Sequence, residues 1–226
     1  MRAIVSIGGS VLVPDLGSER VRAYADSVES LFAANHEIGL VVGGGNVARE
    51  YIETGRDLGA NEMALDQLGI GVTRLNARLL IAALDELAAP TPPETYEDAA
   101  AALHRGDIPV MGGMIPGQTT DAVGAALAET VDADLLVYAT SVSGVYSADP
   151  NEDSDATHYD ELNTSDLVDI IADIEMSAGS NAPVDLLAAK IIQRSQTRTI
   201  VLDGTDPQSV RQAIESGEHD GTEVIP

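Results

Sequence analysis

Glycine runs follow three short apolar segments of the chain, at the positions where β-strands would end. The runs are Gly8-Gly9-Ser10 after Ala3–Ile7, Gly43-Gly44-Gly45 after Ile38–Val42, and Gly112-Gly113 after Ile108–Met111. Glycine lets backbone N–H groups approach an anion closely, and the start of a following helix adds partial positive charge. Ligands of open α/β sheets bind outside the carboxyl ends of the strands. One such run is often only a turn, but three together predict a phosphate-binding edge.

Arginine and hydroxyl side chains follow two of these runs. Arg49 falls in the first turn of a predicted helix, where a cation opposes the helix dipole unless it answers an anion. It is either a forked donor to a phosphate or a surface arginine paired with a nearby glutamate. Thr119, Thr120 and Asp121 form an ordinary helix N-cap signal, although such hydroxyls also bind phosphate. An acid there suits the orientation of donor groups better than direct contact with an anion. For Arg74 we expect a surface role.

Lys190 is the only lysine of the chain. It lies in the segment Val184–Ser195, whose pattern predicts a helix that is apolar nearly all round and therefore largely buried. Its neighbours one turn away are not acidic, so no i,i+4 ion pair explains it. A lysine on such a helix must reach solvent or meet a partner. We therefore favour a functional role for this side chain.

Two generic nucleotide-binding motifs fit poorly. The phosphate-binding loop G-x-x-x-x-G-K-[ST] is absent. Gly43-x-Gly45-x-x-Ala48 matches the dinucleotide pattern, which also needs an acidic residue after the next strand. The candidate acid, Asp66, lies at the start of a predicted long helix instead. Dinucleotide binding is thus the second choice at this step.

Strand-like and helix-like segments alternate along the chain, which predicts a largely parallel sheet with helices on both faces. The predicted strands are Ala3–Ile7, Ile38–Val42, Ile108–Met111, Asp134–Ala139, Thr199–Leu202 and Thr222–Ile225. The predicted helices are Glu19–Asn35, Val47–Leu58, Ala64–Leu87, Tyr96–Arg105, Thr120–Val131, Thr164–Ile174, Val184–Ser195 and Pro207–Ser216. The segment Pro150–Thr157 reads as an acidic loop. No linker divides the chain, so we expect one α/β domain over residues 1–226.

The charge and composition exclude several classes of partner. A net charge of −25 disfavours nucleic acid and anionic membrane surfaces, which need a basic footprint. An acidic shell on a chain that is 44% hydrophobic is instead typical of a folded protein adapted to high salt. There is no cysteine, and the four histidines lack metal-ligand spacing. No signal peptide or membrane-spanning run is found, so a cytoplasmic location is expected.

Several longer stretches resemble one family nearly end to end. They are IGGSVLVP at 7–14, VVGGGNVAREYIE at 41–53, RLNARLLIAAL at 74–84, IPVMGGMIPGQTTDAV at 108–123, TSVSGVYSADP at 140–150 and VDLLAAKII at 184–192. Together they resemble archaeal-type uridylate (UMP) kinases of the amino-acid kinase superfamily. The resemblance implies a three-layer αβα sandwich, and a reaction of ATP with UMP that gives ADP and UDP, with Mg²⁺. It further implies a place in pyrimidine and CTP biosynthesis, and a homohexamer built as a trimer of dimers.

The same resemblance implies roles for individual residues, with the acceptor site in the N-terminal part and the ATP site in the C-terminal part. The implied ATP-binding residues are Gly8, Gly9, Ser10, Thr140, Val145, Tyr146, Asp149 and Lys190. The implied UMP-binding residues are Gly43, Gly44, Gly45, Arg49, Asp66, Thr119, Thr120 and Asp121. Lys190, Asp121, Gly9 and Ser10 would be catalytic, while Mg²⁺ would be held by phosphates and water. Bacterial relatives carry a lysine on the first strand, where this chain has Ser6.

Two alternatives to this function stay open. Other superfamily kinases act on acetylglutamate, carbamate or isopentenyl phosphate, although Arg49, Asp66 and the segment 117–121 favour a nucleotide acceptor. A relative that binds nucleotides without catalysis would keep the fold and lose the chemistry. The presence of Lys190, Asp121 and the glycine runs argues against it.

Overall fold

Seven strands form one sheet in the order β3-β2-β1-β4-β6-β7-β5 in the computed structural model, which describes residues 1–148, 150, 153, 155–175 and 183–226. The strands are β1 (Arg2–Ile7), β2 (Glu37–Val42), β3 (Val110–Met111), β4 (Leu135–Thr140), β5 (Glu161–Asn163), β6 (Thr199–Asp203) and β7 (Thr222–Ile225). Only the β6–β7 pair is antiparallel. The largely parallel sheet that the sequence predicts is confirmed.

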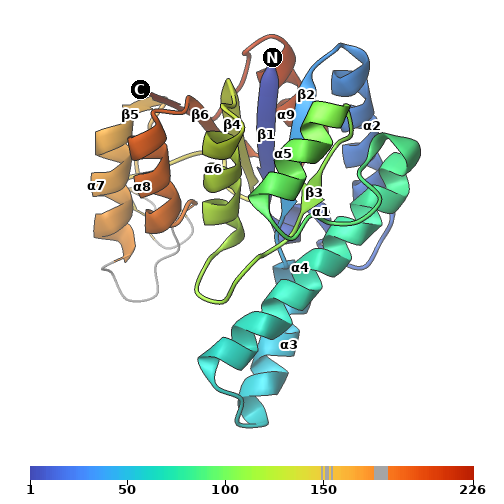
Figure 1. Ribbon diagram of the computed structural model, residues 1–226. Coiled ribbons are helices and arrows are strands. Elements are labelled where there is room, and N and C mark those ends of the chain that lie inside the picture. The colour runs from blue at the N-terminus through green and yellow to red at the C-terminus, as the bar shows by residue number, and fades with distance from the viewer. Residues whose placement is uncertain (149, 151–152, 154, 176–182) are drawn as a thin grey trace.

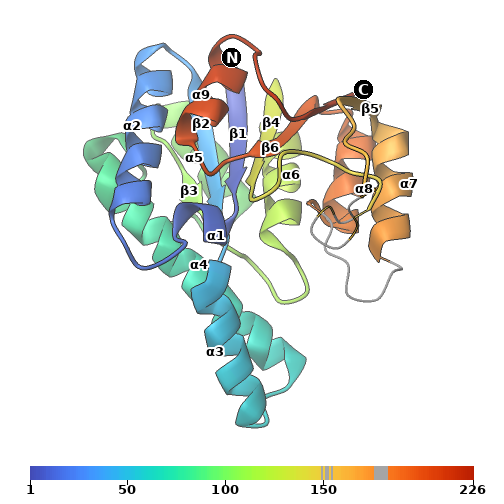
Figure 2. The same ribbon diagram turned by 180° about the vertical axis from the view of Figure 1, so that it is seen from behind.

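Helices cover both faces of the sheet (Figures 1 and 2). One face carries α2 (Glu19–Ala33), α9 (Pro207–Glu215) and the C-terminal half of α4 (Glu62–Leu84). The opposite face carries α5 (Tyr96–Arg105), α6 (Thr120–Thr130), α7 (Thr164–Glu175) and α8 (Leu186–Ser195). The molecule is therefore a three-layer αβα sandwich, as expected.

Alternation along the strands divides the core into two clusters. In β1, Val5 and Ile7 pack into the cluster beneath α2, whereas Ile4 packs into the cluster beneath α6. The two sides of β4 divide in the same way, with Val137 on the first side and Tyr138 on the second. Strands that are buried on both faces read as continuous apolar runs, which is why the sequence revealed them.

Three sequence expectations about local structure were wrong. Gly8-Gly9-Ser10 is not a simple turn, because the short helix α1 (Gly9–Leu12) begins at its second glycine. The predicted helix Ala64–Leu87 begins earlier, at Glu62, because the Asn61 side chain accepts a hydrogen bond from Ala64 N and caps it. It ends at Leu84 and is followed by the 3₁₀ turn η1 (Asp85–Leu87). Strand β5 was missed, since three residues that pair only with β7 carry no local signal.

A helical hairpin projects from the carboxyl edge of the sheet (Figure 1). It consists of α3 (Gly45–Asp57) and the N-terminal half of α4. Its apolar side chains include Tyr51, Leu58, Met63 and Leu75, which are all more than half exposed. Among the described residues, no helix is long and apolar enough to cross a membrane.

Candidate functional site

The first two glycine runs interlock at the carboxyl edge of the sheet. Parallel pairing of β1 with β2 sets Ile7 opposite Val42, so both runs leave the sheet at the same level. A Cβ atom on Gly9 would lie 2.0 Å from Gly45 N, and one on Gly43 would lie 2.6 Å from Gly9 N. The two loops therefore touch backbone to backbone, which only glycine permits.

A buried amide from the long helix α4 supports the second run. Asn76 Nδ2 donates to Gly43 O at 2.8 Å and to Gly44 O at 3.3 Å. Gly45 has a φ of +64°, in the left-handed region that favours glycine. The Asn76 side chain thus fixes the carbonyl groups of Gly43 and Gly44.

The third glycine run is fixed to α4 as well. Gly113 N donates to Thr73 Oγ1 at 2.7 Å, and Arg74 Nε donates to Gly113 O at 3.2 Å. Arg74 also pairs with Glu94 at 3.2 Å. The expected surface role of Arg74 was therefore incomplete, because its guanidinium holds the backbone of this run. Gly112 and Gly113 do not line the cavity described next.

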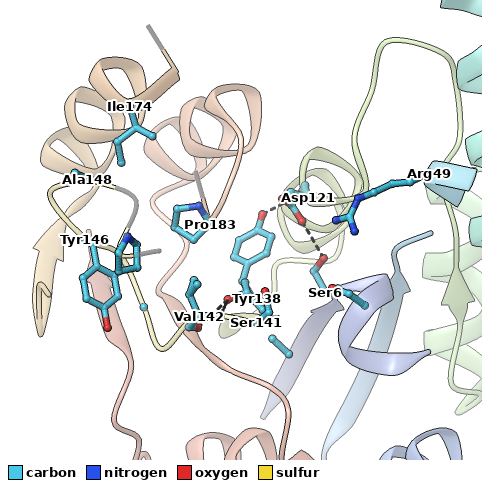
Figure 3. A pocket seen from close by; sticks show the side chains of 16 residues that line it. Ser6, Arg49, Asp121, Tyr138, Ser141, Val142, Tyr146, Ala148, Ile174 and Pro183 are labelled. Carbon is cyan, nitrogen blue, oxygen red and sulfur yellow. Dashed lines mark hydrogen bonds between the residues drawn. The ribbon is translucent and has the colours of Figure 1, made fainter. Parts of the chain in front are cut away.

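A cavity of about 340 Å³ opens beside the first run, and predicted residues from both halves of the chain line it (Figure 3). Gly8, Ser10, Arg49 and Asp121 come from the N-terminal half. Thr140 and Tyr146 come from the segment after β4, together with Ser141 and Val142. The structure thus brings six of the predicted site residues to one place.

A second group of predicted residues lies around this cavity without lining it. Gly9, Gly43, Gly44 and Gly45 form the interlocked support beside it. Asp66 Oδ2 accepts a hydrogen bond from Gly117 N at 2.8 Å, so it is joined to the loop before α6. Thr119 caps α6 by accepting from Ala122 N at 3.1 Å, and Thr120 is the first residue of that helix. Val145 is buried, and its N–H donates to Thr222 Oγ1 at 2.8 Å. Asp149 lies outside the described residues.

Lys190 does not line the cavity. The expectation that α8 is buried nearly all round was wrong, because only its Ala188, Ala189, Ile191 and Ile192 side is buried. Leu187 on the other side is 48% exposed, and Lys190 is exposed there too. Its Nζ atom lies 3.5 Å from Gln193 Oε1. The helix is amphipathic, so solvent exposure alone accommodates the charge.

Asp121 is the most perturbed carboxyl group of the cavity. Burial and the nearby charge of Asp185 raise its pKa to about 7, against a hydrogen bond from Ser6 that lowers it. Ser6 Oγ lies 3.5 Å from Asp121 Oδ1, and Tyr138 OH donates to the Asp121 backbone carbonyl at 2.8 Å. The same burial, with the charges of Asp121 and Asp185, raises the pKa of Tyr138 well above its usual range. Tyr138 is therefore a neutral donor that fixes the backbone of Asp121.

Arg49 is the arginine of this cavity. Its guanidinium points into the cavity on the side of Asp121 and Ser6 (Figure 3). Nη1 donates to Asn46 Oδ1 at 2.6 Å, and no ion pair with a glutamate is found for it among the described residues. An arginine held by a neutral amide keeps its charge available for an anion.

Several residues of this site were missed in the sequence, and four of them make hydrogen bonds that shape it. Ser6 and Tyr138 line the cavity, Asn76 supports a glycine run and Asp185 contacts Thr119. Asn76 carried a usable signal, since a lone amide in the apolar run RLNARLL must find a partner when it is buried. The signal for Asp185 was its position before a helical pattern, which is typical of an N-cap. Its contact with Thr119 depends on tertiary structure and left no sequence trace.

Comparison with known proteins agrees with this geometry. The model of the amino acid kinase family matches residues 1–203. The chain belongs to the amino acid kinase family. A uridylate kinase of Haloarcula marismortui is 68% identical over all 226 residues and 99% of its own length. One of Halobacterium salinarum is 66% identical over the whole chain and 94% of its own length.

Solved structures of amino acid kinases share the architecture as well. The crystal structure of uridylate kinase from Archaeoglobus fulgidus superposes with a TM-score of 0.89, at 45% identity, over 99% of this chain and all of that chain. The three-layer sandwich of this amino acid kinase is therefore the fold of that relative.

The raised pKa of Asp121 predicts how stability depends on pH. The folded protein keeps this proton up to about pH 7, whereas the unfolded chain loses it near pH 4. Ionisation therefore costs the folded state free energy, and this contribution to stability falls as the pH rises from about 4 to about 7. Asp121→Asn should raise the free energy of unfolding at pH 8 by on the order of 2–4 kcal/mol and leave it unchanged below about pH 4.

Denaturant unfolding of both proteins across this pH range checks the prediction. Asp107→Asn is a matched control, because Asp107 is a carboxylate outside the cavity with its own partner, Arg105. An Asp121→Asn variant less stable than the parent at pH 8 contradicts the raised pKa.

Proposed function

We propose that this chain is a uridylate kinase that transfers the γ-phosphoryl group of ATP to UMP. The observation that carries the proposal is the meeting of Arg49 and Asp121 with Thr140 and Tyr146 around one cavity beside interlocked glycine runs. The relatives named above are uridylate kinases, and their likeness extends over the whole chain. The product UDP would supply pyrimidine nucleotide and CTP synthesis, in the cytoplasm.

The proposed transfer needs positioning and charge stabilisation more than proton transfer. A phosphate oxygen of UMP forms a bond to the γ-phosphorus of ATP. The bond from that phosphorus to the bridging oxygen breaks, and ADP leaves with the electron pair. The attacking oxygen is already anionic near neutral pH, so no general base is required. The task of the protein is to bring two anions together.

The charge of the protein opposes this task, and the cavity offsets that opposition locally. Backbone N–H groups of the glycine runs, Arg49 and Lys190 are the donors that we assign to the phosphates. Ser10 lies in the first turn of α1 and lines the cavity, so its N–H and hydroxyl suit the transferring group. We assign Asp121 the orientation of these donors, since its backbone and carboxylate are each hydrogen-bonded.

The residues present suit magnesium that arrives with ATP. The described part of the chain holds no group of three acidic or histidine side chains arranged for a metal. Mg²⁺ keeps several waters and binds mainly to substrate phosphates, so one or two protein carboxylates suffice. Asp121 is the carboxylate in the described lining of the cavity that is able to contribute. When bound, the ion would neutralise phosphate charge.

The two halves of the chain would serve different substrates. We assign the acceptor side to the second glycine run, Arg49, Asp66 and the start of α6, in agreement with the contact between Asp66 and Gly117. The donor side is assigned to the first run and the segment after β4. Tyr146 lies edge-on against His158, with ring centroids 5.0 Å apart, which gives that side an ordered aromatic wall. Both sides belong to the proposed single domain.

A panel of acceptors tests the function directly. With ATP and Mg²⁺, the purified protein should release ADP rapidly with UMP, and CMP, dUMP and GMP measure how strictly the acceptor site selects its nucleotide. Acetylglutamate, carbamate and isopentenyl phosphate serve as acceptors for the alternative superfamily reactions. Turnover of one of these without turnover of UMP would reject the proposal, and ATP binding without any ADP release would favour the non-catalytic alternative.

The two assigned cations should give different kinetic signatures. Arg49→Ala should raise KM for UMP by about tenfold or more and leave KM for ATP nearly unchanged, because the lost contact is to the acceptor. Lys190→Ala should lower kcat by about 10²-fold, as loss of a transition-state donor does. Steady-state kinetics with each substrate varied in turn measures both effects.

Arg194→Ala provides the matched control, because Arg194 is another exposed cation of α8, two-thirds exposed and paired with Glu129. If Lys190→Ala has the same kcat as this control, Lys190 serves solubility and not catalysis. Equal changes of KM for both substrates would remove Arg49 from the acceptor site.

We also propose a homo-oligomer, a hexamer built from dimers, that is adapted to high salt. The exposed apolar side chains of the α3–α4 hairpin support association, since water-exposed leucines are costly unless covered. Two uridylate kinases that are 68% and 66% identical to this chain come from Haloarcula and Halobacterium, and the acidic surface suits concentrated salt. Screening at about 1 M salt confines repulsion to about 3 Å.

Light scattering and thermal unfolding across a KCl series test this proposal. At about 3 M KCl the mass should be a multiple of the 23.5 kDa chain, and the melting temperature should rise with KCl because screening removes self-repulsion. A monomer whose stability is independent of salt contradicts both parts.

A further inference from the structure

The residue before α8 connects two helices of the site. Asp185 Oδ1 accepts a hydrogen bond from Ala188 N at 2.9 Å, which caps the start of α8. Its other oxygen, Oδ2, accepts a hydrogen bond from Thr119 Oγ1. Thr119 is itself the N-cap of α6. One carboxylate therefore joins the first turns of two neighbouring helices.

The two helices carry groups from opposite sides of the proposed reaction. Helix α6 begins with Thr120 and Asp121, which we assigned to the acceptor side. Pro183, two residues before Asp185, lines the cavity near the donor segment, and α8 carries Lys190. Asp185 itself does not line the cavity. Its bond to Thr119 is a direct link between the acceptor helix and the chain that enters α8.

The carboxylate of Asp185 has an electrostatic cost for the site. A carboxylate near Asp121 disfavours a second negative charge, and it does so in a cavity that must accept phosphates. A helix N-cap alone is equally well supplied by a neutral side chain such as asparagine or serine. A charged acceptor, however, binds a hydroxyl donor more strongly than a neutral one. The charge is thus better explained by the bond to Thr119 than by capping.

We propose that Asp185 is a positioning residue for phosphoryl transfer, because its carboxylate holds the start of α8 at a fixed distance from Thr119 at the start of α6. This inference rests on the proposed kinase function. The bond would set the spacing between donor and acceptor sides without touching either substrate. A misplacement of about 1 Å costs on the order of 10² in rate.

Asp185→Asn isolates the link. The amide oxygen still caps Ala188 N, while the neutral amide nitrogen that replaces Oδ2 is a donor, so the charge-assisted hydrogen bond from Thr119 is lost. We expect kcat to fall by about tenfold or more, with KM for ATP and for UMP within about threefold of the parent. Asp206→Asn is the matched control, because Asp206 caps α9 through Gln208 N at 3.0 Å and lies outside this cavity. Asp206→Asn should be destabilised no more than Asp185→Asn is, and its kcat should equal that of the parent.

Coupling with Thr119 distinguishes positioning from a general structural effect. Thr119→Val removes the hydroxyl that donates to Asp185. If the hydrogen bond between Thr119 and Asp185 sets the rate effect, the double variant Thr119→Val with Asp185→Asn should have a kcat only slightly below that of the slower single variant.

Two results would overturn the inference: an Asp185→Asn kcat equal to that of Asp206→Asn, or effects of the two substitutions that multiply independently. The proposed function is tested separately, by assaying the parent protein with the panel of acceptors. A parent that turns over another acceptor allows the same comparison with that acceptor, and a parent without any transfer rejects the function and the inference together.

Discussion

The site depends on the backbone contact between the first two glycine runs. Gly9 and Gly45 approach so closely that a Cβ atom on Gly9 would meet the Gly45 nitrogen at 2.0 Å. This contact is possible because β1 and β2 are parallel neighbours in register, so that Ile7 and Val42 end together. It places two loops rich in N–H groups beside one cavity. The α3–α4 hairpin, with Arg49 on α3, grows directly from the second of them.

Electrostatics places a second constraint on the site. In the proposed reaction a chain with net charge −25 binds two anions, which requires cationic and N–H donors at the site. Arg49 faces the cavity with an amide partner, and Arg74 holds a loop through backbone carbonyls. Asp121 is the exception, since it introduces a carboxyl group into this region. Its raised pKa means that part of this carboxyl group is the neutral acid near pH 7, and a cation beside it would favour its charged form.

The sequence predicted the layers of the fold and part of the site. Strands buried on both faces produce apolar runs, and the glycines after them marked the carboxyl edge, so β1, β2 and β4 were found almost to the residue. Arg49, Asp121 and Tyr146 were placed at the cavity by the resemblance to a family. The pattern failed where partners lie far apart in the chain. Strand β5 exists through β7, Asp185 meets Thr119 across 66 positions, and the exposure of Lys190 follows from which side of α8 packs on α6.

The central claim is that one cavity holds ATP and UMP together and passes a phosphoryl group between them. Phosphorus-31 NMR of the purified protein with both nucleotides and Mg²⁺ tests it most directly, because the spectrum identifies every phosphorus-containing product. The account predicts that ADP and UDP appear in equal amounts when UMP is present, and that ATP stays intact when UMP is omitted. Formation of inorganic phosphate in place of UDP, or loss of ATP at the same rate without UMP, would contradict it.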